Sequence, residues 1–302
     1  MMPTKIFLST NENPTYIEFW PLVATAWKHL GFDPVLALVT NKEHDAWKWM
    51  EEYGEVVQFR ENNRMPSGNW AKLVRWWLYF KYEDEIGIVA DIDMLPLQRE
   101  YFTRFSEEYN PEKHLYLKGT YDNSLTGKFP GCYMIAKGSV WKDIINPDNK
   151  YSDVVEWSKQ FEGRRMYDLK ENPLSPHHIF SEESLMRSVV LMWDPSSEKT
   201  IREARPGGWQ HGMLSTSLRL DRSAWPATKE AWHLFGFTED KKYPDNLARP
   251  QHPGPHEDYY IDSHMLRPLE KAKQHIVPLT KYLGIDPFLI DIGITKSQEM
   301  AK

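Results

Sequence analysis

Two acidic residues, Asp91 and Asp93, follow the apolar run 86–90 directly and are the part of this sequence best suited to chemistry. In an extended segment, side chains at i and i+2 project to the same side, so both carboxylates can converge on one hard cation. The apolar run predicts a strand buried on both faces, and open α/β sheets bind ligands at the carboxyl ends of such strands. The triplet therefore predicts a metal site that could hold a diphosphate. The alternative is an acidic strand end that faces water.

Charged residues on two predicted helices could complete such a site. Lys72 and Arg75 lie three positions apart on the helix predicted over 69–82, so they share a face that could point at phosphates or sugar hydroxyls, or simply at solvent. Glu182 and Glu183 open a helix predicted over 182–190, after Ser181. Acidic side chains are favoured at the positive end of a helix dipole, so capping alone could also explain this acidic pair.

The elements that position these residues alternate along the first part of the chain. Apolar runs predict strands at 5–10, 35–40, 56–59 and 86–90, and helical periodicity predicts helices at 15–30, 44–53 and 69–82. This order indicates a mostly parallel sheet with right-handed crossovers. Further strands are predicted at 116–118 and 132–136, with helices at 139–145 and 151–161, a proline-rich lid at 243–256 and a final helix at 262–283 broken by Pro268 and Pro278.

Composition narrows the class of protein. A chain of 302 residues with 41% hydrophobic content can bury a sizeable core, and its net charge of -6 with mixed signs makes nucleic acid an unexpected partner. No stretch approaches the roughly 20 apolar residues of a membrane span, and no signal-peptide core follows the first methionine, so we expect a cytoplasmic protein without a transmembrane segment. The single cysteine, Cys132, excludes an intrachain disulfide and a zinc cluster of thiolates.

The helix with Lys72 and Arg75, followed by a strand that ends in Asp91-Ile92-Asp93, resembles the GT-A fold glycosyltransferases. It is most similar to the DXD sugar transferases and more weakly similar to the glycogenin-like family. The resemblance implies a Rossmann-like, mostly parallel α/β sheet flanked by helices, within a single catalytic domain over 1–302. Residues 1–97 would bind the nucleotide sugar, 98–240 would form the acceptor and catalytic half, and 241–302 would be an irregular and helical extension.

The resemblance also implies residue roles. Asp93 would be a direct ligand of Mn²⁺ or Mg²⁺, and Asp91 would contact the ribose of the donor or the metal through water. Thr10 and Asn11, at the end of the first strand, would hold the nucleobase and ribose, while Lys72 and Arg75 would face the donor.

Two further roles implied by the resemblance stay open. Glu183, with Glu182 as the other candidate, would be the base of an inverting enzyme or would orient the sugar in a retaining one. His233 lies in a His-x-x-Gly pattern that resembles one in which the histidine is a third metal ligand. Because that pattern continues to a lysine where this chain has Glu239, a packed core histidine is the alternative for His233.

The function implied is metal-dependent transfer of a sugar from a nucleoside-diphosphate sugar, with uridine as the expected base, to a hydroxyl of a glycan or similar acceptor. A phosphohydrolase of the haloacid-dehalogenase type also uses Asp-x-Asp, but on its first strand. A sugar nucleotidyltransferase would need a glycine-rich loop where this chain has residues 9–13. A noncatalytic carbohydrate-binding protein of the same fold is the remaining alternative.

Overall fold

The computed structural model describes residues 2–62, 65–120, 129, 131–161, 182–204, 219–220, 262–265 and 267–301. The strands of its larger sheet are β1 (Lys5–Asn11), β2 (Asp33–Val39), β3 (Glu55–Phe59), β4 (Ile86–Val89), β6 (Leu115–Thr120), β7 (Met134–Lys137) and β8 (Thr200–Ala204). Their order across the sheet is β3-β2-β1-β4-β7-β6-β8. Strand β7 runs antiparallel to β4 and β6, while the other neighbours are parallel. The predicted fold class, α/β with a mostly parallel central sheet, is confirmed.

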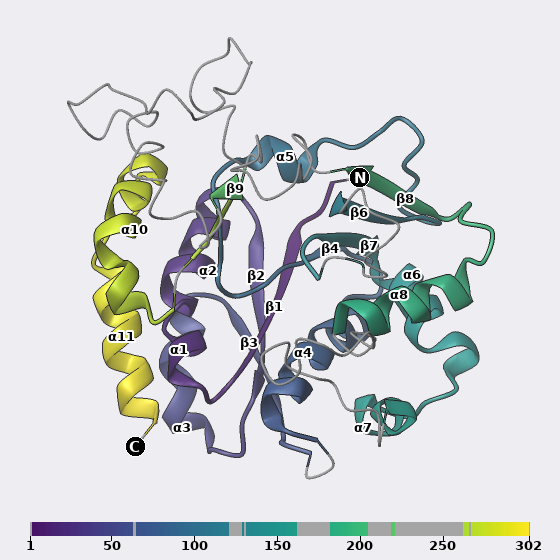
Figure 1. Ribbon diagram of the computed structural model, residues 1–302. Helices are drawn as coiled ribbons and strands as arrows, with labels where there is room; N and C mark the ends of the chain where they lie inside the picture. The colour runs from purple at the N-terminus through teal and green to yellow at the C-terminus, as the bar shows by residue number, and fades with distance from the viewer. Residues whose placement is uncertain are drawn as a thin grey trace, which may run out of the picture.

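Helices cover both faces of this sheet (Figure 1). They are α1 (Pro14–Ile17), α2 (Trp20–His29), α3 (His44–Trp47), α4 (Ser67–Trp77), α5 (Arg99–Thr103), α6 (Gly138–Ile145), α7 (Val154–Ser158), α8 (Glu182–Trp193), α10 (Leu269–Leu283) and α11 (Leu289–Met300). Short 3-10 turns follow α3 at Lys48–Glu52 and α4 at Leu78–Tyr82. The helix predicted over 15–30 is therefore two helices, and those predicted over 44–53 and 69–82 each end in a 3-10 turn.

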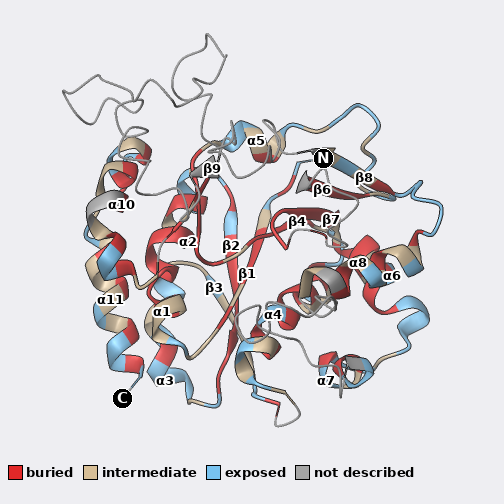
Figure 2. Ribbon diagram, viewed as in Figure 1, coloured by how far each residue is buried: buried red, intermediate tan, exposed pale blue. Residues whose placement is uncertain are grey.

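Successive side chains of the central strands point to opposite faces of the sheet, so the interior is divided into two hydrophobic cores. Ile6 and Leu8 of β1 pack with α2, α10 and α11, whereas Phe7 between them packs with α4 and α6 on the other face. Both sets are fully buried, and Figure 2 shows the middle of the sheet buried between helices that are exposed on their outer sides. Burial on both faces explains why β2 from Val35 onward and β4 are continuous apolar runs in the sequence.

A second, three-stranded sheet begins just after the carboxyl end of β4. It contains β5 (Met94–Pro96), β9 (Arg219–Leu220) and β10 (Asp262–His264), in the order β5-β10-β9. Strand β10 is antiparallel to β5, with His264 opposite Met94, and the Met265 backbone N–H donates to the Asp93 carbonyl at 2.9 Å. This pairing carries a late segment of the chain to the end of β4.

The prediction of one final helix over 262–283 is wrong at its beginning. Residues 262–264 are extended because their backbone groups pair with β5, and the helix begins only after Pro268, which lies at the N-cap of α10. Pro278 lies inside α10 without ending it. The predicted lid at 243–256 lies outside the described residues, and among the helices that are described, none is long and apolar enough to cross a membrane.

Candidate functional site

Asp91 and Asp93 lie where β4 ends and the chain turns into β5. The Ala90 backbone N–H still donates to the Phe7 carbonyl at 3.1 Å, and the Met94 N–H donates back to the Asp91 carbonyl at 3.1 Å. The two carboxylates therefore lie at the carboxyl end of a central parallel strand, the position predicted from the sequence. The extended segment expected to aim both at one cation is instead a turn at residues 92–93, and the two side chains have different partners. Their side chains differ in exposure, with 34% of Asp91 and 7% of Asp93 accessible.

Asp91 is held by a buried arginine. The Arg75 Nη1 donates both to Asp91 Oδ1 and, at 3.1 Å, to the Ala90 carbonyl, and only 4% of the Arg75 side chain is exposed. Burial favours the neutral acid, but the adjacent guanidinium outweighs it and lowers the pKa of Asp91 to about 2. The same pairing overcomes desolvation and raises the pKa of Arg75. The two side chains therefore form an ion pair at neutral pH.

Asp93 has different neighbours, and two of them come from the segment around β10. The His264 Nε2 lies 3.3 Å from Asp93 Oδ2, and the Arg267 Nε lies 3.5 Å from the same oxygen. Arg267 also stacks on the ring of Tyr16, with 4.5 Å between the guanidinium carbon and the ring centroid. The register of β10 on β5 is what places His264 beside Asp93.

The two glutamates of α8 approach the Asp91 side of this turn. Glu183 Oε1 accepts the Gly131 backbone N–H at 3.4 Å, and its own carbonyl accepts the Phe129 N–H at 3.2 Å. A Cβ on Gly131 would lie 2.7 Å from Arg75 Nη2, so any larger residue there would force the guanidinium to shift. Glu183 is thus brought next to the Arg75–Asp91 pair.

Lys72 and Glu182 form the outer part of this group. The Lys72 Nζ donates to Glu182 at 3.2 Å, with 48% of the lysine side chain exposed. Lys72 and Arg75 lie three positions apart on α4 and differ in burial, since 4% of the Arg75 side chain is exposed.

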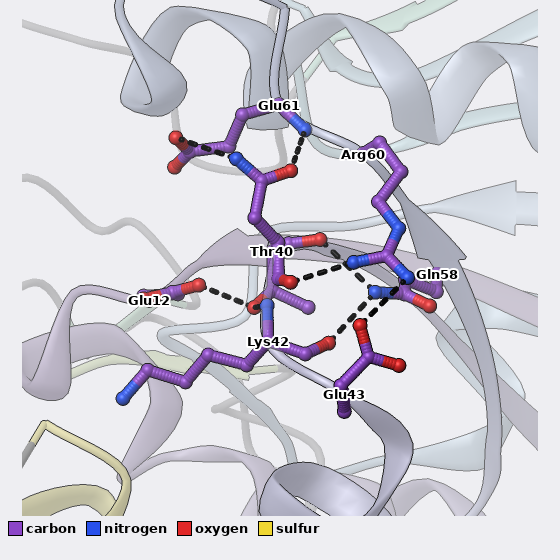
Figure 3. A network of polar contacts seen from close by, with 8 residues as sticks. Glu12, Thr40, Lys42, Glu43, Gln58, Arg60 and Glu61 are labelled. Atoms are coloured by element: carbon purple, nitrogen blue, oxygen red, sulfur yellow. Dashed lines mark hydrogen bonds and ion pairs between the residues drawn. The ribbon is translucent and has the colours of Figure 1, made fainter.

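Thr10 and Asn11 end β1 at the same edge of the sheet. The Asn11 Nδ2 donates to Ser67 Oγ at 3.0 Å, which ties the strand end to the start of α4, and Thr10 is only 3% exposed. A network of polar contacts follows along this edge (Figure 3). Thr40 donates to Glu12, and Gln58 Nε2 donates to the Thr40 carbonyl at 3.1 Å, which fixes the ends of β1, β2 and β3 relative to one another.

The histidine expected near the two aspartates, His233, lies outside the described residues, while His264 occupies that place. Sequence reasoning missed His264 because it has no spacing motif of its own. The available signal was the short polar stretch 262–264 ahead of Arg267 and Pro268, which has the length of a β-strand but was assigned to a helix.

Asp93 and His264 offer an oxygen and a nitrogen donor on adjacent strands. Across the described part of the chain, no three His, Cys, Asp or Glu side chains gather as a complete metal site. Mg²⁺ in nucleotide enzymes is commonly held by one or two carboxylates, with substrate phosphates and water completing its shell. Two protein donors fit a cation of that kind, whereas a closed structural metal site would need more of them.

Comparison with known proteins gives a fold likeness only. No protein-family model matches the sequence, and no curated protein matches it. The structure resembles that of the galactosyltransferase LgtC in complex with donor and acceptor sugar analogues, at 10% identity and a TM-score of 0.43, over 93% of this chain and 95% of LgtC. It also resembles the glycosyltransferase GlyE of Streptococcus pneumoniae, at 11% identity and a TM-score of 0.42, over 95% of this chain and 62% of GlyE. Identities and TM-scores this low do not assign an activity to the chain.

Proposed function

We propose that this chain is a metal-dependent glycosyltransferase that moves a sugar from a nucleoside-diphosphate sugar, with uridine as the expected base, to a hydroxyl of a glycan or similar acceptor. The observation that carries the proposal is the meeting of Asp93 and His264 at the carboxyl end of β4. This is where an open, mostly parallel sheet binds its ligand, and both side chains are metal donors.

In this proposal, Asp93 and His264 are the residues that would hold a divalent cation at the diphosphate of the donor. When bound, the cation supplies Lewis-acid neutralisation of the diphosphate as the glycosidic bond breaks. Asp91 remains in its pair with Arg75 and contributes through its position beside the donor. Thr10 and Asn11, at the end of β1, are the proposed contacts to the nucleoside.

Glu183 is the carboxylate proposed to face the sugar or the acceptor. Its hydrogen bond from Gly131 orients the side chain, and the Arg75–Asp91 pair lies next to it. Glu182 is engaged by Lys72, which makes it the weaker candidate for accepting a proton from the acceptor hydroxyl.

The contacts of Asp91 favour transfer over phosphate hydrolysis. An aspartyl phosphatase needs its first aspartate as a nucleophile, whereas here the Asp91 carboxylate is bound by a buried guanidinium. A carboxylate held in this way is oriented and electrostatically stabilised, which weakens it as a nucleophile.

The test is a calorimetric titration with UDP, GDP and UDP-sugars, with and without Mn²⁺, joined to an assay of nucleoside diphosphate released from the sugar donor. Metal-dependent binding of one nucleotide and its release on transfer to a glycan are expected. Binding without any release would instead indicate the noncatalytic carbohydrate-binding alternative. Release of inorganic phosphate would indicate the phosphohydrolase.

A further inference from the structure

Arg267 and His264 both contact one oxygen of the candidate metal site, Oδ2 of Asp93. Both approach Oδ2 of Asp93, His264 Nε2 at 3.3 Å and Arg267 Nε at 3.5 Å. A neutral imidazole and a carboxylate can share a cation, but a guanidinium is always charged and cannot be a ligand. A divalent ion bound to Asp93 would therefore lie close to a positive charge, and the two would repel one another.

The surroundings of Arg267 allow it to move. It lies on the short stretch between β10 and α10, 29% of its side chain is exposed, and its guanidinium rests on the face of Tyr16. Arg75 differs in each respect, because it is 4% exposed and is also bonded to the Ala90 carbonyl within the core. Arg75 is thus a buried part of the core, whereas Arg267 is partly exposed and is held by Asp93 and the ring of Tyr16.

We propose that Arg267 is a latch that closes on Asp93 in the cation-free protein and is displaced when a divalent cation binds. The displaced guanidinium stays beside the site and becomes available to the diphosphate, for which its planar set of donors is suited. The cation thus binds before the donor and prepares the phosphate contact. This inference rests on the proposed function, since it takes the same cation and donor as given.

The decisive measurement is the affinity for Mn²⁺ in the absence of nucleotide. Electron paramagnetic resonance gives this affinity, because it detects the free Mn²⁺ that remains in a titration. Arg267→Gln should bind Mn²⁺ about tenfold more tightly than the wild type because the competing charge is gone. With Mn²⁺ saturating, the same variant should bind UDP several-fold more weakly because a phosphate contact is lost. Opposite changes in the two affinities are the signature of the latch.

Two variants serve as controls. Arg99 also stacks on a ring, that of Phe32, and donates to the Leu30 carbonyl, but it has no part in the site, so Arg99→Gln should leave both affinities unchanged. Arg267→Lys keeps the charge and should bind Mn²⁺ much as the wild type does. An equal gain in the Lys and Gln variants would overturn competition by charge.

The outcomes separate the latch from the proposed function. Unchanged or weaker Mn²⁺ binding by Arg267→Gln, with normal binding by the wild type, would overturn the latch and leave the metal site standing. Mn²⁺ binding by neither the wild type nor Arg267→Gln, in the presence or absence of UDP, would overturn the metal-dependent function itself. Thermal unfolding of each variant confirms that the folded proteins are being compared.

Discussion

Asp91 and Asp93 are two residues apart, yet they lie in environments of different kinds. Asp91 is neutralised by Arg75, a buried side chain from the helix just before the strand. Asp93 is approached by His264 and Arg267, which come from the other end of the chain and are themselves partly exposed. The first carboxylate is part of the framework, whereas the second can exchange its partners. An Asp-x-Asp triplet thus does not make its two acids equivalent.

The difference follows from how each pair is made. The pairing of Asp91 with Arg75 links α4 to the end of β4, two elements that follow one another in the sequence and pack in the same core. The contacts of Asp93 depend on β10 returning to pair with β5. The local, buried Arg75–Asp91 pair favours a rigid structure. The contacts of Asp93 come from a distant part of the chain and are partly exposed, so a bound ligand can replace them.

The largest effect is expected from Asp93→Asn, which leaves the side-chain shape but removes the negative charge. We expect loss of Mn²⁺ binding and a fall in transfer of about a thousandfold, since the metal stabilises charge in the transition state by several kcal/mol. Calorimetry with Mn²⁺ and a rate assay measure this. Asp91→Asn is the matched control and should keep Mn²⁺ affinity within a few-fold. Equal loss in both variants would mean that the two acids share one role.

These roles could be predicted from the sequence only where the interactions are local. The alternation of strands and helices, the triplet after β4 and the basic face of α4 are visible because each depends on periodicity within one segment. His264 was missed because its role depends on the register of β10 against β5, a pairing across most of the chain that no local pattern specifies. The same pairing overrode the helical assignment of residues 262–264.

The next effect in size concerns Glu183, on the Asp91 side. Glu183→Gln should keep donor and Mn²⁺ binding while lowering the transfer rate about a hundredfold, because a general base contributes roughly that much. Glu182→Gln, which removes the charge paired with the half-exposed Lys72, should change the rate less than threefold. Full activity in Glu183→Gln, measured as nucleotide release, would remove Glu183 from the chemistry.

A smaller effect, now on stability, separates the two arginines. Arg75→Met keeps the apolar stem but leaves Asp91 without its counter-charge, which costs several kcal/mol for fully buried pairs. Because Asp91 is 34% exposed, we expect a loss of about 2 kcal/mol in the free energy of unfolding. Arg267→Gln leaves Asp93 its contact with His264 and removes a side chain that is itself 29% exposed, so it should lose less than about 1 kcal/mol. Urea unfolding gives both values, and equal losses would contradict the division between a framework pair and an exchangeable one.

The smallest effect is expected from Glu18, which contacts the start of α10, a point close in sequence to Arg267. The buried Glu18 accepts the Leu269 backbone N–H at 2.6 Å and so fixes the start of α10, just after Arg267. Burial, only partly offset by this hydrogen bond, raises the pKa of Glu18 above its ordinary value of 4.5. The folded protein then holds this proton more tightly than the unfolded chain does. Glu18 therefore contributes a stability that is greatest below the unfolded pKa and declines as pH rises through the folded pKa.

Glu18→Gln accepts the same N–H without titrating, so it should flatten the dependence of unfolding free energy on pH in that window and leave the Mn²⁺ affinity unchanged. Urea unfolding over a series of pH values, with the wild type measured in parallel, tests this. A change in Mn²⁺ affinity would show that the start of α10 and the Asp93 contacts are coupled more closely than their separate hydrogen bonds indicate.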